Sequence, residues 1–271
     1  MSKSSHCIAI IQARMGSSRL PGKVLLDLAG QPMLVRVLER VQRARLLDQV
    51  VVATTTDASD DLLVDFCRER GYSCLRGNQF DVLDRYYQVA LQLQAQVVVR
   101  ITGDCPLIDP GLIDEAIAIF QESRVDFLAN RLPPPFHRSF PIGLDIEMCT
   151  FAALERAWHE ADQMFEREHV MPYLYEGVIL QPESPTRSSG VSPHGFRVLQ
   201  LQYVPNLGDL RWTVDTVEDL AFVQQVFSHF NQRDDFTWLE ALVFIRSNPD
   251  LARINASVPH KHLHQTDERG R

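Results

Sequence analysis

QARMGSSRLPGK, residues Gln12 to Lys23, follows an apolar run, Cys7 to Ile11, that is typical of a buried first strand. The stretch contains three cations, Arg14, Arg19 and Lys23, which no protein core buries without partners. Its glycines and serines let the backbone turn sharply and bring N–H groups toward a ligand. Because guanidinium groups bind phosphate oxygens in pairs and lysine adds a point charge, the composition suits a triphosphate. A solvated basic turn is the alternative, but the position directly after a first strand favours phosphate binding.

Strand and helix alternate through the first half of the chain. Apolar runs and helical spacing predict further strands at 49–54, 72–75, 96–102 and 125–129, and helices at 32–44, 59–70, 81–94 and 110–121. Such strict alternation indicates an α/β protein with a mostly parallel sheet and helices on both faces. Asp81 is expected to cap its helix, with Asp84 and Arg85 on a solvated face.

The pattern changes after Asn130, where three consecutive prolines interrupt the chain. Beyond them the sequence predicts strands at 143–149, 196–203 and 211–214, helices at 151–161, 167–176, 217–230 and 237–246, and a loop at 181–195. We interpret residues 1–255 as one domain with an inserted α+β subdomain at about 130–204. Residues 256–271, which include three histidines, are predicted to be a disordered tail.

Composition excludes several classes of protein. A net charge of −8 and a pI of about 5.6 argue against a nucleic-acid-binding protein. The five cysteines form no CxxC pair, so neither a zinc site nor a disulfide framework is indicated, and we expect reduced thiols in a cytoplasmic protein. No secretory signal is visible, and no apolar run reaches the roughly 18 residues of a membrane helix.

Two aspartates are predicted to stand next to the basic loop. Asp104 follows the strand at 96–102, and Asp215 follows the strand at 211–214. The carboxyl ends of parallel strands line the ligand crevice, and Mg²⁺ takes one or two carboxylates plus substrate phosphates. The alternatives are a turn residue for Asp104 and a helix N-cap for Asp215, a role that Thr216 also suits.

A second acidic pair lies in GLDIE, residues 143–147. Asp145 and Glu147 share one face of the predicted strand, because strand side chains repeat every two residues. Like charges placed side by side call for a cation, a polar ligand or solvent.

The stretch QARMGSSRLPGKVL resembles the N-terminal signature of the cytidylyltransferases that make CMP-activated acidic sugars, most closely their spore coat polysaccharide branch. Four further segments share the resemblance: GDCP at 103–106, VDTVED at 214–219, GLDIE at 143–147 and EHV at 168–170. A fifth is RGNQFDVLDRYY at 76–87. The resemblance implies a GT-A-like, Rossmann-like nucleotidyltransferase sheet. It also implies Mg²⁺-dependent transfer of CMP from CTP to an acidic sugar, release of pyrophosphate, and a role in surface polysaccharide synthesis.

The resemblance, together with the position of each residue in the predicted sheet, suggests roles for individual residues. Catalysis is expected from Arg14, Lys23, Asp104 and Asp215, with the metal on the two aspartates. Nucleotide contacts are expected from Gln12, Ala13, Arg14, Gly16, Ser17, Arg19, Lys23, Thr54, Arg76 and Asp104. Acceptor contacts are expected from Asp145, Glu147, Glu168 and His169. His169 is a candidate general base, with a packed helical histidine as the alternative, and Arg138 is a candidate partner for an acceptor carboxylate.

A homodimer is expected through the inserted region, from the family resemblance and from four apolar side chains: Phe136, Phe140, Met148 and Phe151. Two other functions compete with cytidylyl transfer. A GT-A glycosyltransferase that uses a sugar nucleotide usually carries a DxD motif, whereas Asp104 is followed by Cys and Pro. A non-catalytic nucleotide-binding module would be favoured by loss of the loop cations or of either aspartate, and all are present.

Overall fold

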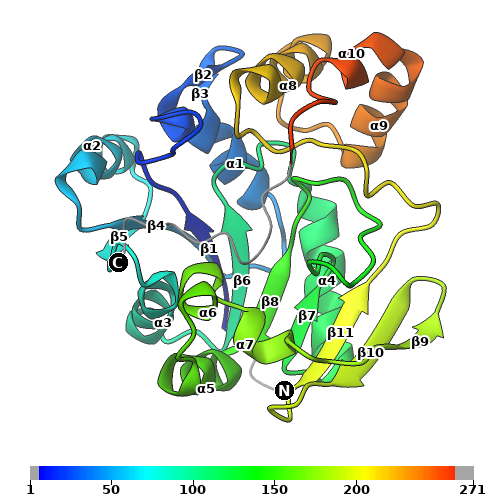
Figure 1. The fold of residues 1–271 in the computed structure, drawn as a ribbon. Helices are drawn as coiled ribbons and strands as arrows, with labels where there is room; N and C mark the ends of the chain where they lie inside the picture. The colour runs from blue at the N-terminus through cyan, green and yellow to red at the C-terminus, as the bar shows by residue number, and fades with distance from the viewer. Residues whose placement is uncertain (1–5, 260–271) are drawn as a thin grey trace.

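The computed structural model describes residues 6–259 (Figure 1). In this part of the chain one nine-stranded sheet has the order β5-β4-β1-β6-β8-β7-β11-β10-β9. Its strands are β1 (Cys7–Gln12), β4 (Gln49–Thr55), β5 (Cys74–Gly77), β6 (Val97–Thr102), β7 (Phe127–Ala129), β8 (Glu147–Thr150), β9 (Gln181–Ser184), β10 (Arg187–Val191) and β11 (Arg197–Leu201). The short strands β2 (Asp27–Leu28) and β3 (Gln31–Pro32) pair separately.

Helices connect most of these strands. They are α1 (Met33–Val41), α2 (Asp61–Arg70), α3 (Val82–Gln92), α4 (Pro110–Ser123), α5 (Phe151–Glu160), α6 (Met164–His169), α7 (Pro172–Tyr175), α8 (Val217–His229), α9 (Trp238–Ser247) and α10 (Pro249–Arg253). Two 3-10 helices, η1 (Lys23–Leu25) and η2 (Ala58–Asp60), follow the loops after β1 and β4. Of the described helices, none combines the length and the apolar character that crossing a membrane requires.

Strand β1 lies at the centre of the parallel part of the sheet. It pairs in parallel with β4 on one side and β6 on the other. Ile8 and Ile10 point into one core while Ala9 and Ile11 point into the other, so both faces of the strand are buried. This explains the uninterrupted apolar run in the sequence and confirms the predicted α/β fold.

Helices cover both faces of the sheet (Figure 1). One core contains apolar side chains of α1, α4, α8 and α9, such as Leu34, Ile117 and Val223. The other contains side chains of α3, α5 and α7, such as Tyr86 and Leu154. The loops at the carboxyl ends of β1 and β6 therefore rest on a scaffold packed from two sides.

Residues 130–204, expected to form an inserted subdomain, contribute four strands to the same sheet. β8 lies between β6 and β7 and is antiparallel to both. β11 pairs in parallel with β7 and carries the hairpin of β9 and β10 at the sheet edge. Met148 and Cys149 of β8 are fully buried, as in a central strand.

Four predictions of local structure are wrong. The strand expected at 143–149 begins only at Glu147, so Asp145 lies before β8 and not on a shared strand face. Residues 181–195 contain β9 and β10 in place of a loop, because pairing with β11 overrides the weak strand propensity of Ser and Gly. Residues 211–214 form only an isolated bridge, Ile142 with Arg211. The helix expected at 167–176 is two helices, which a positive φ at Val170 and Pro172 at the start of α7 separate.

The side chains that motivated the homodimer pack inside this chain. Phe140 and Met148 are buried, and Phe136 and Phe151 pack against the core. The dimer stays a prediction. Of the predicted tail, residues 256–259 continue from a turn after α10, and residues 260–271 lie outside the described part.

Candidate active site

The loop after β1 is closed by hydrogen bonds to a single carbonyl. The Met15 carbonyl accepts from the backbone N–H groups of Ser17 and Gly22, each at 2.9 Å. Gly22 has a φ of 68°, a left-handed conformation that favours glycine. The chain then enters η1, whose first residue is Lys23. The loop geometry therefore directs Lys23 back across the end of the sheet.

A buried carboxylate on η2 anchors this loop from behind. Asp60 is 1% exposed, and its Oδ1 accepts from the Met15 N–H at 2.7 Å. Its Oδ2 accepts from the Thr54 hydroxyl at 3.0 Å and from the Thr55 N–H at 3.1 Å. Thr54, which we expected to contact the nucleotide, is fully buried and supports the loop from within. Asp60 was not singled out in the sequence, where only its place shortly after β4 offered a signal.

Lys23 joins the two aspartates predicted at the strand ends. Its ammonium donates to Asp104 Oδ2 at 2.7 Å, to Asp215 Oδ1 at 2.9 Å and to the Val214 carbonyl at 2.9 Å. Arg19 Nη2 lies 2.8 Å from Asp215 Oδ2. Arg211, from the segment before α8, donates to the same oxygen at 2.9 Å. Four predicted residues, Arg19, Lys23, Asp104 and Asp215, thus meet at one centre.

The charges at this centre stabilise one another. Burial alone would raise the pKa of Asp215, but Lys23 and Arg19 lower it to about 2. Burial alone would lower the pKa of Lys23, but Asp104 and Asp215 raise it above its ordinary value. Both groups are therefore ionised at neutral pH.

Asp104 is fixed by the turn that follows β6. Its Oδ1 accepts from the Thr102 hydroxyl at 2.6 Å, and its carbonyl accepts from the Val214 N–H at 2.8 Å. At Gly103, an added Cβ would lie 3.1 Å from the Gln12 carbonyl oxygen and 3.2 Å from Ala13 Cβ. Glycine therefore lets the loops after β1 and β6 approach each other.

Asp215 does not cap α8, which was the alternative role for this residue. The N-cap of α8 is Thr216, which accepts from the Asp219 N–H at 3.3 Å. Asp219 is fully buried and receives two hydrogen bonds of 2.8 Å from Arg211. Arg211 thereby reaches across from Asp219 to position Asp215.

The two carboxylates suit a divalent metal ion. Both lie within 3 Å of one ammonium nitrogen, so they converge on a single cation position. Mg²⁺ is commonly held by one or two carboxylates together with substrate phosphates. Across residues 6–259 there is no cluster of three or more His, Cys, Asp or Glu side chains arranged for a metal. The remaining ligands of a metal here would come from substrate oxygens and water.

A first cavity of about 410 Å³ opens beside the start of the loop. Its walls come from the end of β1, the β5–α3 connection, the first turn of α3, and α6 with the residues before it. The predicted nucleotide contacts Gln12 and Arg14 line it together with the predicted acceptor contacts Glu168 and His169. Asp81 caps α3, as predicted, by accepting from the Asp84 N–H at 2.8 Å.

Asp81 also pairs with Arg167 of α6, whose Nη2 lies 2.5 Å from Asp81 Oδ2. This ion pair joins α6 to α3, which lie side by side in Figure 1. Arg85 lines the same cavity and is 1% exposed, so the prediction that it lies on a solvated face is wrong.

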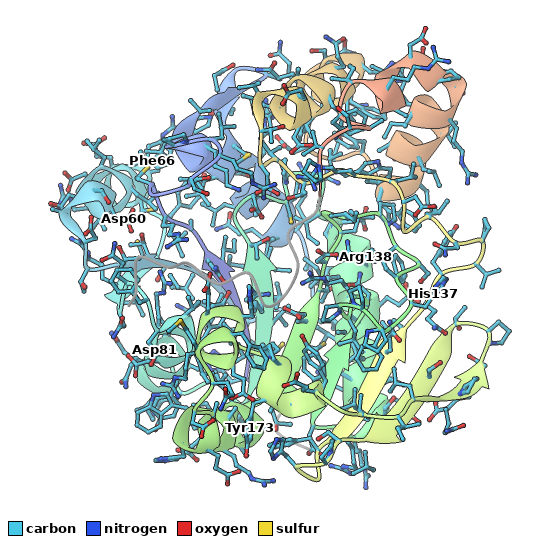
Figure 2. All side chains as sticks on the ribbon, in the orientation of Figure 1. Asp60, Phe66, Asp81, His137, Arg138 and Tyr173 are labelled. Carbon is cyan, nitrogen blue, oxygen red and sulfur yellow. The ribbon has the colours of Figure 1, made fainter. Side chains whose placement is uncertain are left out.

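A second cavity of about 410 Å³ opens on the other side of β6, toward β8 and the Pro-rich segment. Figure 2 labels Asp81 of the first cavity and Arg138 of the second, and they lie on opposite sides of β6. The second cavity contains Arg19, Asp104 and Asp215 of the cluster around Lys23, and also the acidic pair Asp145 and Glu147. It is lined by five guanidinium groups, of Arg19, Arg100, Arg131, Arg138 and Arg211, and by four carboxylates, of Asp104, Asp145, Glu147 and Asp215.

Arginines pair with the two carboxylates of this acidic pair, and of these arginines only Arg138 was predicted from the sequence. Glu147 forms an ion pair with Arg100, and Arg138 Nη1 lies 3.3 Å from Asp145 Oδ1. Burial alone would lower the pKa of Arg131, but Asp145 and Glu147 raise it. Arg100 lines both cavities, so the two sites are neighbours on either side of its side chain.

The remaining predicted residues lie around the loop. Ala13 is buried and donates to the Ala53 carbonyl at 3.2 Å, and the Ser17 hydroxyl accepts from the Leu20 N–H at 3.4 Å. At Gly16 an added Cβ would meet open space. Arg76 donates to the Thr55 carbonyl at 2.7 Å and to Asp61 at 2.7 Å, so it ties β5 to the end of β4.

A mostly parallel sheet with a cationic loop after its first strand and two carboxylates at that edge defines a nucleotidyltransferase-type site. The chain belongs to the cytidylyltransferase family, whose model, described as Cytidylyltransferase, matches residues 8–226. The sequence resemblance and the enzyme class are thereby confirmed.

Individual relatives agree with this assignment. A solved cytidylyltransferase from Leptospira borgpetersenii superposes with a TM-score of 0.81 at 30% identity, over 95% of this chain and all of that one. The spore coat polysaccharide biosynthesis protein SpsF of Bacillus subtilis is 31% identical over 90% of this chain and 95% of its own length. The 3-deoxy-manno-octulosonate cytidylyltransferase of Geobacter sulfurreducens is 44% identical over 46% of this chain and 50% of its own length.

Proposed function

We propose that this protein transfers CMP from CTP to an acidic sugar or a related anionic acceptor, with release of pyrophosphate, in surface polysaccharide synthesis. The observation that carries the proposal is the convergence of Lys23, Arg19, Asp104 and Asp215 at the second cavity, which adjoins the first at Arg100. A two-substrate transfer needs one binding site on each side of the reacting atoms.

In this proposal the nucleoside occupies the first cavity and the acceptor occupies the second. The first cavity adjoins Gln12 and Arg14 at the start of the basic loop. Glu168 and His169 then form the α6 wall of the nucleoside site. The second cavity holds the charged groups that a sugar acid needs, including Arg131 and Arg138 for its carboxylate and Asp145 for its hydroxyl groups.

The chemistry is attack of an acceptor oxygen on the α-phosphorus of CTP. A bond forms from that oxygen to phosphorus, and the bond to the leaving pyrophosphate breaks. Such a transfer depends on in-line positioning and on neutralised charge. Lys23, Arg14 and Arg19 offset the charge of the phosphates, and Asp104 and Asp215 would hold Mg²⁺. The metal would supply further positive charge at the phosphate oxygens.

A cytoplasmic location is also proposed. The five cysteines are free thiols, and four of them are buried. Five free thiols in one chain fit a reducing compartment.

Pyrophosphate release tests the proposed function. The protein is incubated with Mg²⁺, each of the four ribonucleoside triphosphates and a panel of sugar acids, neutral phosphosugars and small phosphoacids. We expect release that requires both CTP and a sugar acid, and that stops in chelator. Activity with a finished sugar nucleotide would instead identify a glycosyltransferase. Nucleotide binding without turnover of any acceptor would support a non-catalytic module.

A further inference from the structure

Two of the five cysteines lie side by side where α2 meets β5. Cys67 is a buried residue of α2, and Cys74 is the partly exposed first residue of β5. The Cys67 thiol donates a hydrogen bond to the Cys74 sulfur. Both side chains pack in the same core. The two sulfurs are therefore in contact without being bonded.

A tight turn brings the two cysteines together. Gly71 ends α2 in a left-handed conformation with a φ of 75°, and the Tyr72 N–H donates to the Cys67 carbonyl at 2.9 Å. β5 then begins at Cys74, which pairs with Val52 of β4. The turn and the sheet together hold the two thiols at a fixed place in the scaffold.

The two thiols differ in reactivity. The hydrogen bond from Cys67 lowers the pKa of Cys74, and the nearby Arg76 supports this shift while burial opposes it. The same hydrogen bond, together with burial, raises the pKa of Cys67. The thiolate is the nucleophilic form of cysteine, and partial exposure gives an oxidant access to it. Cys74 is therefore suited to react first, and Cys67 to react with the product.

The other three cysteines lie in a different environment. Cys7, Cys105 and Cys149 are buried, and burial raises the pKa of each thiol. Buried thiols in apolar surroundings are inert. The reactive chemistry is thereby confined to the pair at α2 and β5.

The cysteine pair adjoins the groups that support the basic loop. Asp60, the carboxylate that anchors this loop, lies close enough to Cys74 for its charge to act on the pKa of that thiol. Two residues after Cys74, Arg76 donates to the Thr55 carbonyl at 2.7 Å and to the Asp57 carbonyl at 2.8 Å. A displacement of Cys74 therefore alters the contacts that hold the loop.

We propose that Cys67 and Cys74 form a reversible disulfide when the protein meets hydrogen peroxide, and that this modification weakens nucleotide binding. The disulfide itself is independent of the proposed function, whereas its effect on CTP rests on that function. A disulfide bond is about 2.05 Å long, so the two sulfurs must move closer than a hydrogen-bonded contact. This movement acts on Asp60 and Arg76 and hence on the basic loop.

The reaction has two steps. In the first, the Cys74 thiolate attacks one oxygen of hydrogen peroxide, the O–O bond breaks and hydroxide leaves, so the sulfur is oxidised to a sulfenic acid and the peroxide is reduced. In the second, the Cys67 sulfur attacks the Cys74 sulfur and the S–O bond breaks. The hydroxyl group leaves as water with the Cys67 proton. A thiol reductant reverses the product by exchange.

Peptide mapping tests the disulfide directly. The full chain is treated with a small excess of hydrogen peroxide, blocked with N-ethylmaleimide in denaturant and digested with trypsin. Cleavage at the neighbouring arginines places the two cysteines in separate peptides, 46–68 and 71–76. We expect these peptides to be linked in the oxidised wild type and in the matched control Cys7→Ala, and to separate in dithiothreitol. In Cys67→Ser we expect Cys74 to stop at the sulfenic acid, which dimedone traps.

Nucleotide affinity tests the consequence of the disulfide. Dissociation constants for CTP with Mg²⁺ are measured on the reduced and the oxidised protein. We expect the oxidised wild type to bind CTP about fivefold more weakly, the scale of one lost hydrogen bond, and to recover in dithiothreitol. Cys67→Ser and Cys74→Ser should bind CTP as the reduced wild type does, with or without peroxide.

Each part of the proposal can be overturned separately. Absence of the linked peptides in the oxidised wild type, or Cys74 oxidised beyond the sulfenic acid while Cys67 stays free, would overturn the disulfide. A disulfide that leaves the affinity for CTP unchanged would overturn its effect on the site. If Cys67→Ser does not fold, Cys74→Ser, at the partly exposed position, decides the matter. A reduced wild type that does not bind CTP would overturn the proposed function and leave the peptide result standing.

Discussion

The two cavities that meet at Arg100 have similar volumes but differently arranged charges. In the first, the ion pair of Asp81 with Arg167 joins two helices, and neither Nε nor Nη1 of Arg85 has a hydrogen-bond acceptor within residues 6–259. In the second, five guanidinium groups and four carboxylates, Asp104 and Asp215 among them, line the cavity. Under the proposed function, the apolar side chains Phe80, Val82 and Met164 of the first cavity suit a base, and the charged groups of the second suit an anionic acceptor. Variants that act on one cavity and not on the other test this contrast.

The largest effect is expected at the two aspartates that line the second cavity, Asp104 and Asp215. Asp104→Asn and Asp215→Asn should each lower kcat by about 10²–10³-fold, the scale of losing one preorganised electrostatic contact in a transition state. The double variant should lose little more, because groups that hold one metal act as a unit. Pyrophosphate release at varied Mg²⁺ measures this, with the exposed Asp250→Asn as control. Losses that multiply in the double variant would show that the two carboxylates act separately.

Lys23→Met should produce the next largest loss. A charge-assisted contact is worth roughly 1.5–3 kcal/mol, so kcat/KM for CTP should fall about 10- to 100-fold. The variant also leaves Asp104 and Asp215 without the ammonium between them. Mg²⁺ should therefore raise its melting temperature more than it raises that of the wild type. An equal Mg²⁺ shift in both proteins would mean that the metal does not use the position between the carboxylates.

Arginines of the two cavities should give opposite kinetic signatures. Arg138→Gln and Arg131→Gln should raise the KM of the acceptor about tenfold and leave the KM of CTP unchanged, because their guanidinium groups line the second cavity. Arg14→Ala, from the first cavity, should raise the KM of CTP instead. Steady-state kinetics with each substrate varied in turn checks the pattern. If both sets of variants affected the same substrate, the assignment of the cavities would be wrong.

The smallest effect concerns stability in acid. The pKa of Asp215 in the folded protein, about 2, lies below its ordinary value of 3.8. A lowered pKa contributes stability that is fully present above about pH 4 and is lost as the pH falls through 2. From pH 5 to pH 3 the advantage of the wild type over Asp215→Asn should narrow by about 1 kcal/mol. Urea unfolding at both pH values measures it, and an advantage that stays constant or grows would contradict the charge assignment.

Much of this architecture follows from local sequence patterns. The apolar runs of β1 and β6 and the helical spacing of α3 and α4 identified the parallel part of the sheet, because these strands are buried on both faces. The rule that ligands bind at the carboxyl ends of parallel strands placed Asp104 beside the basic loop. Asp215 also lies beside the loop, although the strand predicted before it is only an isolated bridge. The reason is that the Val214 N–H still donates to the Asp104 carbonyl.

Other features depend on contacts that no local pattern contains. β10 is a strand because β11 offers it a partner, and Gly190 fits because any Cβ would lie 2.4 Å from the Ile179 carbonyl oxygen. Arg85 follows Asp84 in the sequence, and two adjacent charged residues suggested a solvated helix face. In the structure α3 packs against β5 and α6, and Arg85 is buried. The role of Lys23 between two carboxylates depends on the left-handed turn at Gly22, which only the folded loop reveals.

The central claim is that nucleoside and acceptor occupy the two cavities that meet at Arg100, with the cation–carboxylate centre in the acceptor cavity. A crystal structure of the protein with Mg²⁺ and a non-hydrolysable analogue of CTP tests it most directly. We predict the base in the first cavity beside Arg85, the α-phosphorus near Asp104 and Asp215, and the second cavity open for the acceptor. A base bound in the second cavity, among Arg131, Arg138 and Asp145, would contradict the account.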